Sequence, residues 1–148
     1  MEPYIKLSRE LTNNLSKIEK KQYGIYFTPP DTVSKTIDIL APYLQDIHTV
    51  LEPSCGSCEY ILSLLTKYPH LQVTGIEYNN TIFKAIQILK TVTTIQLYHL
   101  DFLTTSDDQK YDLIIGNPPY YVMKKGDVNK SYYPYFDGRP NIFILFLI

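Results

Sequence analysis

Short apolar segments alternate with helix-like segments through the middle of this chain, and that alternation restricts the fold more than any other feature. The predicted strands are residues 49–51, 72–77, 94–100 and 111–116, and the predicted helices between the first three are residues 59–67 and 81–90. Strands separated by helices or loops favour a mostly parallel sheet with right-handed crossovers. We therefore expect an α/β fold with helices on both faces of the sheet.

The N-terminal region predicts two further helices. Apolar residues recur every three or four positions between residues 4 and 21, as in an amphipathic helix; they are Leu7, Leu11, Leu15 and Ile18. A second helix is expected over residues 32–43, capped by Asp31 or Thr28. This organisation divides the chain into an N-terminal helix, residues 1–22, and one α/β domain, residues 23–148.

Composition limits what the chain as a whole can bind. With 148 residues, 45% of them hydrophobic, it forms one compact domain rather than two. A net charge of −1 gives no overall basic surface of the kind that binds nucleic acid. Four cations do cluster locally, in a pattern that is more often a solvated loop; they are Lys124, Lys125, Lys130 and Arg139. No secretory signal follows Met1, so an intracellular protein without a membrane partner is expected.

Cys55 and Cys58 form a C-x-x-C pair, which occurs in redox sites and in halves of zinc sites. A zinc site needs a second pair of ligands, whereas His48, His70 and His99 stand singly. We therefore expect no metal site, and no structural disulfide in an intracellular protein.

Small and polar residues follow the first predicted strand, at the edge where an open α/β sheet binds its ligands. This loop, residues 52–58, offers Glu52, Ser54 and Gly56. Its small residues let the backbone approach a ligand closely.

Acidic and aromatic residues end the next two strands. Glu77 lies about twenty residues beyond the first loop, the spacing at which a carboxylate binds ribose hydroxyls, and Tyr78 is beside it. Asp101 and Phe102 end the third strand and suit the amine and the ring of an adenine. Each residue alone is explained equally well by a cap or a turn. Because the fold brings these strand ends to one crevice, together they predict a nucleoside cofactor.

The fourth predicted strand leads into Asn117-Pro118-Pro119-Tyr120. The two prolines have no backbone N–H and fix φ near −65°, so the loop presents acceptors in a rigid arc. The Asn117 side-chain oxygen and the Pro118 carbonyl suit the two N–H groups of an exocyclic amine, and Tyr120 suits the face of a flat base. The alternative is an ordinary turn with a packed tyrosine. The motif favours a site for an aromatic amine.

These motifs together resemble the adenine-specific DNA methyltransferases that use S-adenosylmethionine, in the gamma order of restriction–modification enzymes. The resemblance covers residues 22–120, and the matching stretches are residues 26–30, residues 52–58, Glu77, Asp101 with Phe102, and residues 117–120. It implies a Rossmann-like methyltransferase fold for residues 23–148. It also implies that Phe27 and Thr28 contact the methionine moiety, and that Asn117, which borders the cofactor, is catalytic together with Pro118 and Tyr120.

Two features depart from the family's pattern. Cys58 stands where the family has a second glycine, which predicts a side chain beside the methionine moiety. The helix after the fourth strand only begins, at residues 141–148, so the fold is expected to be incomplete, with later strands and the target-recognition region outside this chain. We expect DNA to be contacted mostly by that region, and a complementary polypeptide or a restriction endonuclease to be a partner.

The resemblance also implies a mechanism. The amine of adenine is a weak nucleophile because its lone pair is delocalised into the ring. Hydrogen bonds from both N–H groups to Asn117 and Pro118 favour direct in-line transfer of the methyl group. Positioning and electrostatics then account for the rate acceleration. The base has to leave the duplex, and Tyr120 then stacks on it.

Two other functions fit the same motifs. Asn-Pro-Pro-Tyr also occurs in methyltransferases that act on glutamine side chains or on RNA bases, although the Phe27-Thr28-Pro29-Pro30 stretch favours the DNA class. Alternatively, the chain is an inactive remnant or one half of a split enzyme. A coding sequence immediately downstream that supplies the missing strands would identify the split enzyme.

Overall fold

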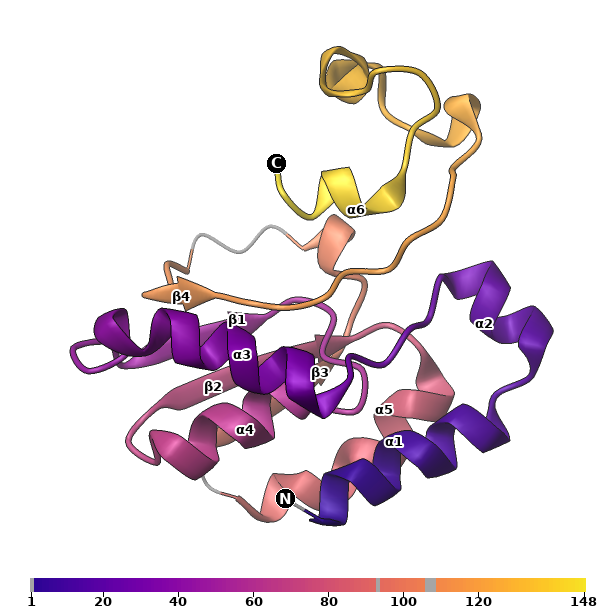
Figure 1. Ribbon diagram of the computed structural model, residues 1–148. Helices are drawn as coiled ribbons and strands as arrows, with labels where there is room; N and C mark the ends of the chain where they lie inside the picture. Colours follow the sequence, from indigo (N-terminus) through magenta and orange to yellow (C-terminus); the bar gives the residue numbers. More distant parts are fainter. Residues whose placement is uncertain (1, 93, 106–108) are drawn as a thin grey trace.

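Four parallel strands form one sheet (Figure 1), which confirms the predicted α/β fold. This computed structural model describes residues 2–92, 94–105 and 109–148, and its strands are β1 (Thr49–Glu52), β2 (Gln72–Glu77), β3 (Ile95–His99) and β4 (Leu113–Ile114). Their order is β3-β2-β1-β4. The strand order reverses between β1 and β4, and an open α/β sheet binds its ligand at such a point.

Helices lie on both faces of the sheet (Figure 1). The α-helices are α1 (Glu2–Asn14), α2 (Lys17–Tyr23), α3 (Pro30–Leu40), α4 (Glu59–Lys67), α5 (Asn80–Ile86) and α6 (Ile142–Leu145). Helices α1, α3, α4 and α5 are on one face, and the single turn of α6 is on the other. Leu145 of α6 lines an open groove of about 760 Å³ together with Leu51, Thr74 and Ile114 of the sheet. Within the described ranges, no helix combines the length and the apolar character needed to cross a membrane.

Short 3-10 helices connect these elements within the described ranges. They are η1 (Ala41–Tyr43), η2 (Gln87–Thr91), η3 (Phe102–Thr104), η4 (Lys125–Asp127) and η5 (Lys130–Tyr135). The predicted helix over residues 81–90 is therefore α5 followed by the tighter turns of η2, whereas α4 and β2 have the predicted bounds.

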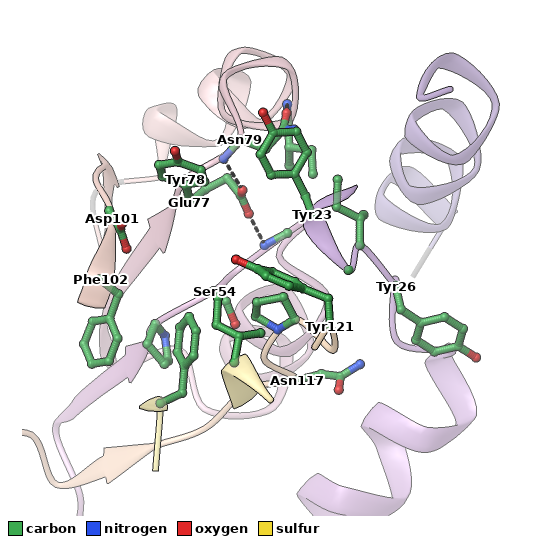
Figure 2. A pocket seen from close by; sticks show the side chains of 18 of the residues that line it. Tyr23, Tyr26, Ser54, Glu77, Tyr78, Asn79, Asp101, Phe102, Asn117 and Tyr121 are labelled. Atoms are coloured by element: carbon green, nitrogen blue, oxygen red, sulfur yellow. Dashed lines mark hydrogen bonds between the residues drawn. The ribbon is translucent and has the colours of Figure 1, made fainter. Parts of the chain in front are cut away.

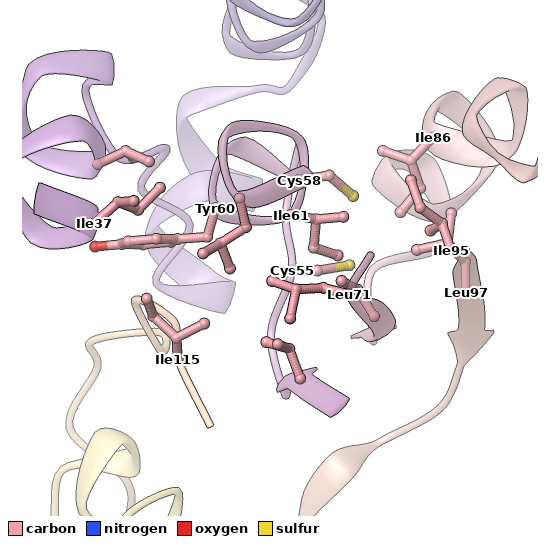
Figure 3. Packing of buried hydrophobic residues seen from close by; sticks show 14 of the residues in the cluster. Ile37, Cys55, Cys58, Tyr60, Ile61, Leu71, Ile86, Ile95, Leu97 and Ile115 are labelled. Atoms are coloured by element: carbon pink, nitrogen blue, oxygen red, sulfur yellow. The ribbon is translucent and has the colours of Figure 1, made fainter. Parts of the chain in front are cut away.

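The hydrophobic core lies between the sheet and the helices α3, α4 and α5 (Figure 3). Ile37, Ile61 and Ile86, one from each helix, have no exposed surface. Fully burying such a side chain contributes about 1.5–3 kcal/mol. Gly75 of β2 allows α4 this close approach, because a Cβ there would lie 2.8 Å from Ile61 Cδ1 and 2.9 Å from Leu97 Cδ2.

The N-terminal helix differs from the prediction. Residues 4–21 form parts of two helices, α1 and α2, rather than one. The break lies at Ser16, whose Oγ accepts a hydrogen bond from the Glu19 N–H at 3.1 Å and caps α2. Leu11 and Leu15 are buried as predicted, but Ile18, beyond the break, is 78% exposed. A polar cap thus overrides the hydrophobic period.

The start of α3 is also different. The helix begins at Pro30 with Pro29 at the capping position, and neither Asp31 nor Thr28 caps it with a side chain. Proline suits this place because its φ is already helical and the missing N–H would have no helical partner. The Thr28 hydroxyl is therefore available for another contact.

A carboxylate fixes β4 against β1. Asp112 Oδ2 accepts hydrogen bonds from the backbone N–H groups of His48, at 2.9 Å, and Thr49, at 2.8 Å. These bonds hold the pKa of Asp112 below its usual value. Strand β4 has two residues rather than the predicted six, although the Asp112 and Ile115 N–H groups on either side of it also donate to β1 carbonyls, at 3.1 and 3.0 Å. This anchoring places Asn117 beside the loop after β1.

Candidate active site

Most predicted site residues line one cavity of about 360 Å³ at the carboxyl ends of the strands (Figure 2). This volume lies in the range of roughly 300–1,000 Å³ that is typical of small-molecule sites. The predicted residues in its lining are Phe27, Ser54, Gly56, Glu77, Tyr78, Asp101, Phe102 and Asn117. Four other predicted residues, Thr28, Glu52, Pro118 and Tyr120, are outside the lining.

Glu77 joins the cofactor loop to the end of β2. Its Oε2 accepts a hydrogen bond from the Gly56 N–H at 2.9 Å, and its Oε1 accepts one from the Asn79 N–H at 2.6 Å (Figure 2). Burial raises the pKa of Glu77, and these two backbone bonds oppose the rise. Each carboxylate oxygen has a second lone pair, so Glu77 can position the loop and still accept from a ligand.

Ser54 provides a polar atom without a partner at the cavity. Its hydroxyl is buried and makes no hydrogen bond in the described part of the protein. Leaving a buried hydroxyl unsatisfied costs about 1–3 kcal/mol. A polar ligand in this cavity would remove that cost, so the residues present fit a nucleoside cofactor.

Glu52 is a core carboxylate rather than a cavity residue. It is 3% exposed, and its Oε2 has no hydrogen-bond partner among the described residues. Burial raises the pKa of Glu52 well above its usual value, and the neighbouring Cys58, Glu59 and Glu77 add to the rise. Burial likewise raises the pKa of Glu59, which bonds to the hydroxyl groups of Ser8 and Ser57.

These raised pKa values predict a pH-dependent stability. The native state binds protons on Glu52, Glu59 and Glu77 more tightly than the unfolded state, whose carboxyls titrate near 4.5. The stability contribution is therefore complete below that value and is lost as pH rises through the folded pKa values. We expect the melting temperature to be a few degrees higher near pH 5 than near pH 8. Asp112, whose pKa is lowered from 3.8, contributes stability above that pH and loses it only at lower pH, outside the pH range compared.

Thermal unfolding followed by circular dichroism at several pH values measures this effect. Glu52→Gln should flatten the pH dependence, while Asp46→Asn, at an exposed carboxylate without an ion pair among the described residues, serves as the control. A melting temperature that falls from about pH 8 to about pH 5 would contradict the assignment.

Cys55 and Cys58 are free, buried thiols packed in the core (Figure 3). The hydrogen bond with Cys58 and burial raise the pKa of Cys55 well above its usual range, which disfavours the thiolate that redox chemistry requires. Cys58 has φ +66°, a left-handed conformation that favours glycine. The Cys58 side chain was expected beside the methionine moiety. It is instead fully buried in the core and does not line the cavity.

Asp101 and Phe102 form the far wall of the cavity. Asp101 Oδ1 accepts from the Leu103 N–H at 3.0 Å and caps η3, so the residue both starts a turn and lines the cavity. The Phe102 ring stacks on Phe146 just after α6, with 5.5 Å between centroids and 21° between planes. One face of Phe102 is thus covered by the C-terminal segment.

The Asn117 side chain is held by Thr28. Asn117 Nδ2 donates to Thr28 Oγ1 at 3.1 Å, and Thr28 is 9% exposed. This bond uses the donor end of the amide and leaves Oδ1 as an acceptor. Gly24 supports the same loop: with φ +61°, its Cα comes so close that a Cβ would lie 2.8 Å from the Tyr120 backbone nitrogen. The segment before α3 therefore fixes the predicted acceptor loop.

Tyr120 and Pro118 lie outside the cavity. Tyr120 is 52% exposed, and its ring packs at a tilt on Phe143 of α6, with 5.5 Å between centroids. A ring that is half exposed beside Asn117 remains accessible to a base that arrives from solvent.

Sequence reasoning missed several aromatic residues of the cavity. Tyr23 and Tyr121 line it, and Tyr23 meets the Tyr78 ring edge to face at 6.1 Å (Figure 2). Burial, with Asp101, Tyr78 and Tyr23 nearby, raises the pKa of Tyr121, so its hydroxyl remains a donor. The position of Tyr121 next to the Asn-Pro-Pro-Tyr motif was the only sequence signal. In the described ranges, no group of three or more His, Cys, Asp or Glu residues is arranged to hold a metal ion.

One protein family matches the part of the chain that carries Glu77, Asp101 and the Asn-Pro-Pro-Tyr motif. The match to the Eco57I restriction-modification methylase family covers residues 60–148, which is more than half of the chain. The chain belongs to the Eco57I restriction-modification methylase family. Membership confirms the resemblance to methyltransferases of restriction–modification systems.

Curated relatives of this Eco57I family member are also methylases. It is 30% identical to modification methylase CviBIII of Paramecium bursaria Chlorella virus NC1A over 99% of this chain and 38% of the relative. It is 33% identical to type II methyltransferase M.CvrRI of Paramecium bursaria Chlorella virus XZ-6E over 80% of this chain and 30% of the relative. The chain thus spans about a third of the length of these relatives.

Solved structures confirm the Rossmann-like fold. A putative caffeoyl-CoA O-methyltransferase from Staphylococcus aureus superposes with a TM-score of 0.51 at 18% identity, over 75% of this chain and 58% of that one. The plantazolicin methyltransferase BpumL, in complex with SAH, gives a TM-score of 0.52 at 16% identity, over 78% of this chain and 47% of that one. SAH is the demethylated form of S-adenosylmethionine, the methyl donor predicted for this chain, and the family to which the chain belongs is a methylase family.

Proposed function

We propose that the chain is the catalytic region of a DNA adenine-N6 methyltransferase. The observation that carries the proposal is the acceptor loop at the end of β4, where Asn117 lines the cofactor cavity and keeps its Oδ1 oriented by Thr28. When bound, S-adenosylmethionine supplies an electrophilic methyl group on a sulfonium. Ser54, Glu77 and Asp101 are the polar side chains proposed to hold it.

The loop suits the amine of adenine. In the described residues, neither Asn117 Oδ1 nor the Pro118 carbonyl accepts a hydrogen bond, so both are free for the two N–H groups of the amine. Two such bonds favour a lone pair localised on nitrogen, and preorganised acceptors need no rearrangement during transfer. Tyr120, exposed beside Asn117, provides a stacking face for a base that has left the duplex.

Thr28 is proposed to act as a positioning residue. Thr28→Val keeps the side-chain volume but removes the hydroxyl that holds Asn117. Loss of one such hydrogen bond costs about 0.5–1.5 kcal/mol, so methyl transfer should fall about 3- to 10-fold at saturating cofactor. Cofactor affinity, measured by calorimetry, should stay nearly unchanged, and Thr28→Ser should restore the rate. A weaker cofactor affinity with an unchanged rate would instead make Thr28 a cofactor ligand.

A choice among acceptors tests the proposed function. The protein is incubated with methyl-labelled S-adenosylmethionine and equal amounts of unmethylated DNA, RNA and a glutamine-containing peptide. Label in the N6 position of deoxyadenosine supports the proposal. Label in RNA or in the glutamine amide would contradict it.

A further inference from the structure

Directly after the acceptor loop the chain leaves the sheet, forms a long loop and returns beside the point where that loop began. Residues 124–139, the basic excursion, rise beyond α6 (Figure 1) and include η4 and η5. Their base is closed by the antiparallel bridge between Val122 and Asn141. The Met123 N–H also donates to the Pro140 carbonyl at 2.8 Å, and the Ile142 N–H donates to the Tyr121 carbonyl at 3.0 Å. The base is therefore fixed a few residues from Asn117.

The excursion is internally ordered although it is mostly exposed. Val128 is its buried anchor, at 5% exposure. Asn129 caps η5 by accepting from the Ser131 N–H at 3.0 Å. The Tyr133 hydroxyl donates to the Lys125 carbonyl at 2.9 Å, and the Lys125 ammonium lies 5.1 Å from the Tyr133 ring. Part of the cost of ordering these side chains on binding is thus already met.

Charge is distributed unevenly between the excursion and the rest of the chain. The excursion holds four cations and two carboxylates, a net charge of +2, whereas the remaining residues carry −3. The cations Lys124, Lys125, Lys130 and Arg139 are exposed, and none has a carboxylate partner in the described part of the chain. Unpaired cations concentrated on one segment of an acidic protein mark a surface for an anionic partner.

The chemistry of the excursion favours nucleic acid among anionic partners. Tyr132 and Tyr135, at 38% and 57% exposure, present rings between the cations. Phosphates are contacted by lysine and arginine, while exposed rings contact sugars and bases. A membrane surface would instead call for an amphipathic helix, and η4 and η5 are short 3-10 turns.

We propose that the basic excursion contacts the phosphate backbone of the duplex that flanks the methylated adenine. This inference rests on the proposed function and adds a DNA-contacting surface within the catalytic region itself. The closed base lets these contacts orient the duplex relative to Asn117.

Salt-dependent DNA binding tests the inference. The quadruple variant K124Q/K125Q/K130Q/R139Q is compared with K6Q/R9Q/K35Q/K84Q, which removes the same number of exposed cations of the same types from α1, α3 and α5. The affinity for a fluorescent duplex is measured by anisotropy between roughly 50 and 200 mM salt. Each lost phosphate contact lowers the magnitude of the slope of log K against log salt by about 0.9.

We expect the first variant to bind the duplex at least about 10-fold more weakly at low salt. Its slope of log K against log salt should correspond to the loss of two or more phosphate contacts. The control variant should bind with nearly the affinity and slope of the native protein. Equal losses in both variants would overturn the inference, because only net charge would then matter. A selective loss toward RNA or toward anionic vesicles, with DNA binding unchanged, would overturn it as well. The acceptor-choice experiment reports on the proposed function separately, since it identifies the methylated atom and not the binding surface.

Discussion

Asn117→Ala is expected to reduce methyl transfer to DNA by roughly 10²–10³-fold, the usual cost of removing one preorganised polar group from a transition state. The variant removes the oxygen proposed to accept from the amine, together with the donor to Thr28. Because the Asn117 backbone and the cavity walls remain, the dissociation constant of S-adenosylmethionine should change by less than about threefold. Single-turnover transfer and calorimetry measure the two quantities.

Two controls sharpen this experiment. Asn13→Ala removes an exposed amide on α1 and should have no effect on transfer. Asn117→Asp keeps an oxygen acceptor but loses the donor to Thr28, so its rate should lie between those of the native protein and Asn117→Ala. Loss of cofactor binding in parallel with loss of transfer would show that Asn117 acts through the cofactor.

Glu77→Gln should weaken S-adenosylmethionine binding by roughly 10- to 100-fold, since hydrogen bonds to a charged group contribute about 1.5–3 kcal/mol. The amide keeps the shape of Glu77 but can accept with one oxygen only, so its NH2 group faces either the Gly56 or the Asn79 N–H. The loop and the proposed ribose contact are both disturbed. The transfer rate at saturating cofactor should change by only a few fold, because the acceptor loop is untouched.

Glu59→Gln is the matched control for Glu77→Gln. Glu59 is another buried carboxylate with a raised pKa in the same region, but it does not line the cavity. Its substitution should leave cofactor affinity nearly unchanged, with thermal unfolding confirming that both variants fold. Equal loss of affinity in the two variants would mean that buried charge, and not the ribose contact, explains the effect.

The sheet was predictable because its signals are local. The bounds of α4 and β2 follow from hydrophobic period and from turn residues on either side, and the structure has both as predicted. The two N-terminal helices show the limit of that reasoning. Apolar spacing alone predicts one continuous helix, but the Ser16 cap starts a second helix. The anchoring of β4 was not predictable from local signals, because Asp112 bonds to Thr49 across 63 residues of sequence.

The lining of the cavity was predictable where strand ends alone place a residue. Glu77, Asp101 and Asn117 follow from the rule that ligands bind at the carboxyl ends of parallel strands. Glu52 did not follow this rule, because side chains alternate along β1 and Glu52 shares the buried face of Val50.

Other features of the site depend on contacts that no local pattern encodes. Thr28 meets Asn117 across 89 residues of sequence, and Gly24 meets the Tyr120 backbone across 96. Tyr23 and Tyr121 reach the cavity from two segments that only the fold brings together. Cys58 has a left-handed backbone conformation and is buried in the core. A cysteine in the sequence does not predict that conformation.

The most direct test of the proposed chemistry is a nucleoside analysis of DNA from cells. The gene that encodes this chain is expressed in a host without adenine methylation, beside its Asn117→Ala variant, and the DNA is digested and analysed by mass spectrometry. The acceptor loop predicts N6-methyldeoxyadenosine with the native gene and none above background with the variant. Methyl groups on cytosine, or DNA without any new methylated nucleoside, would contradict a site built around the adenine amine.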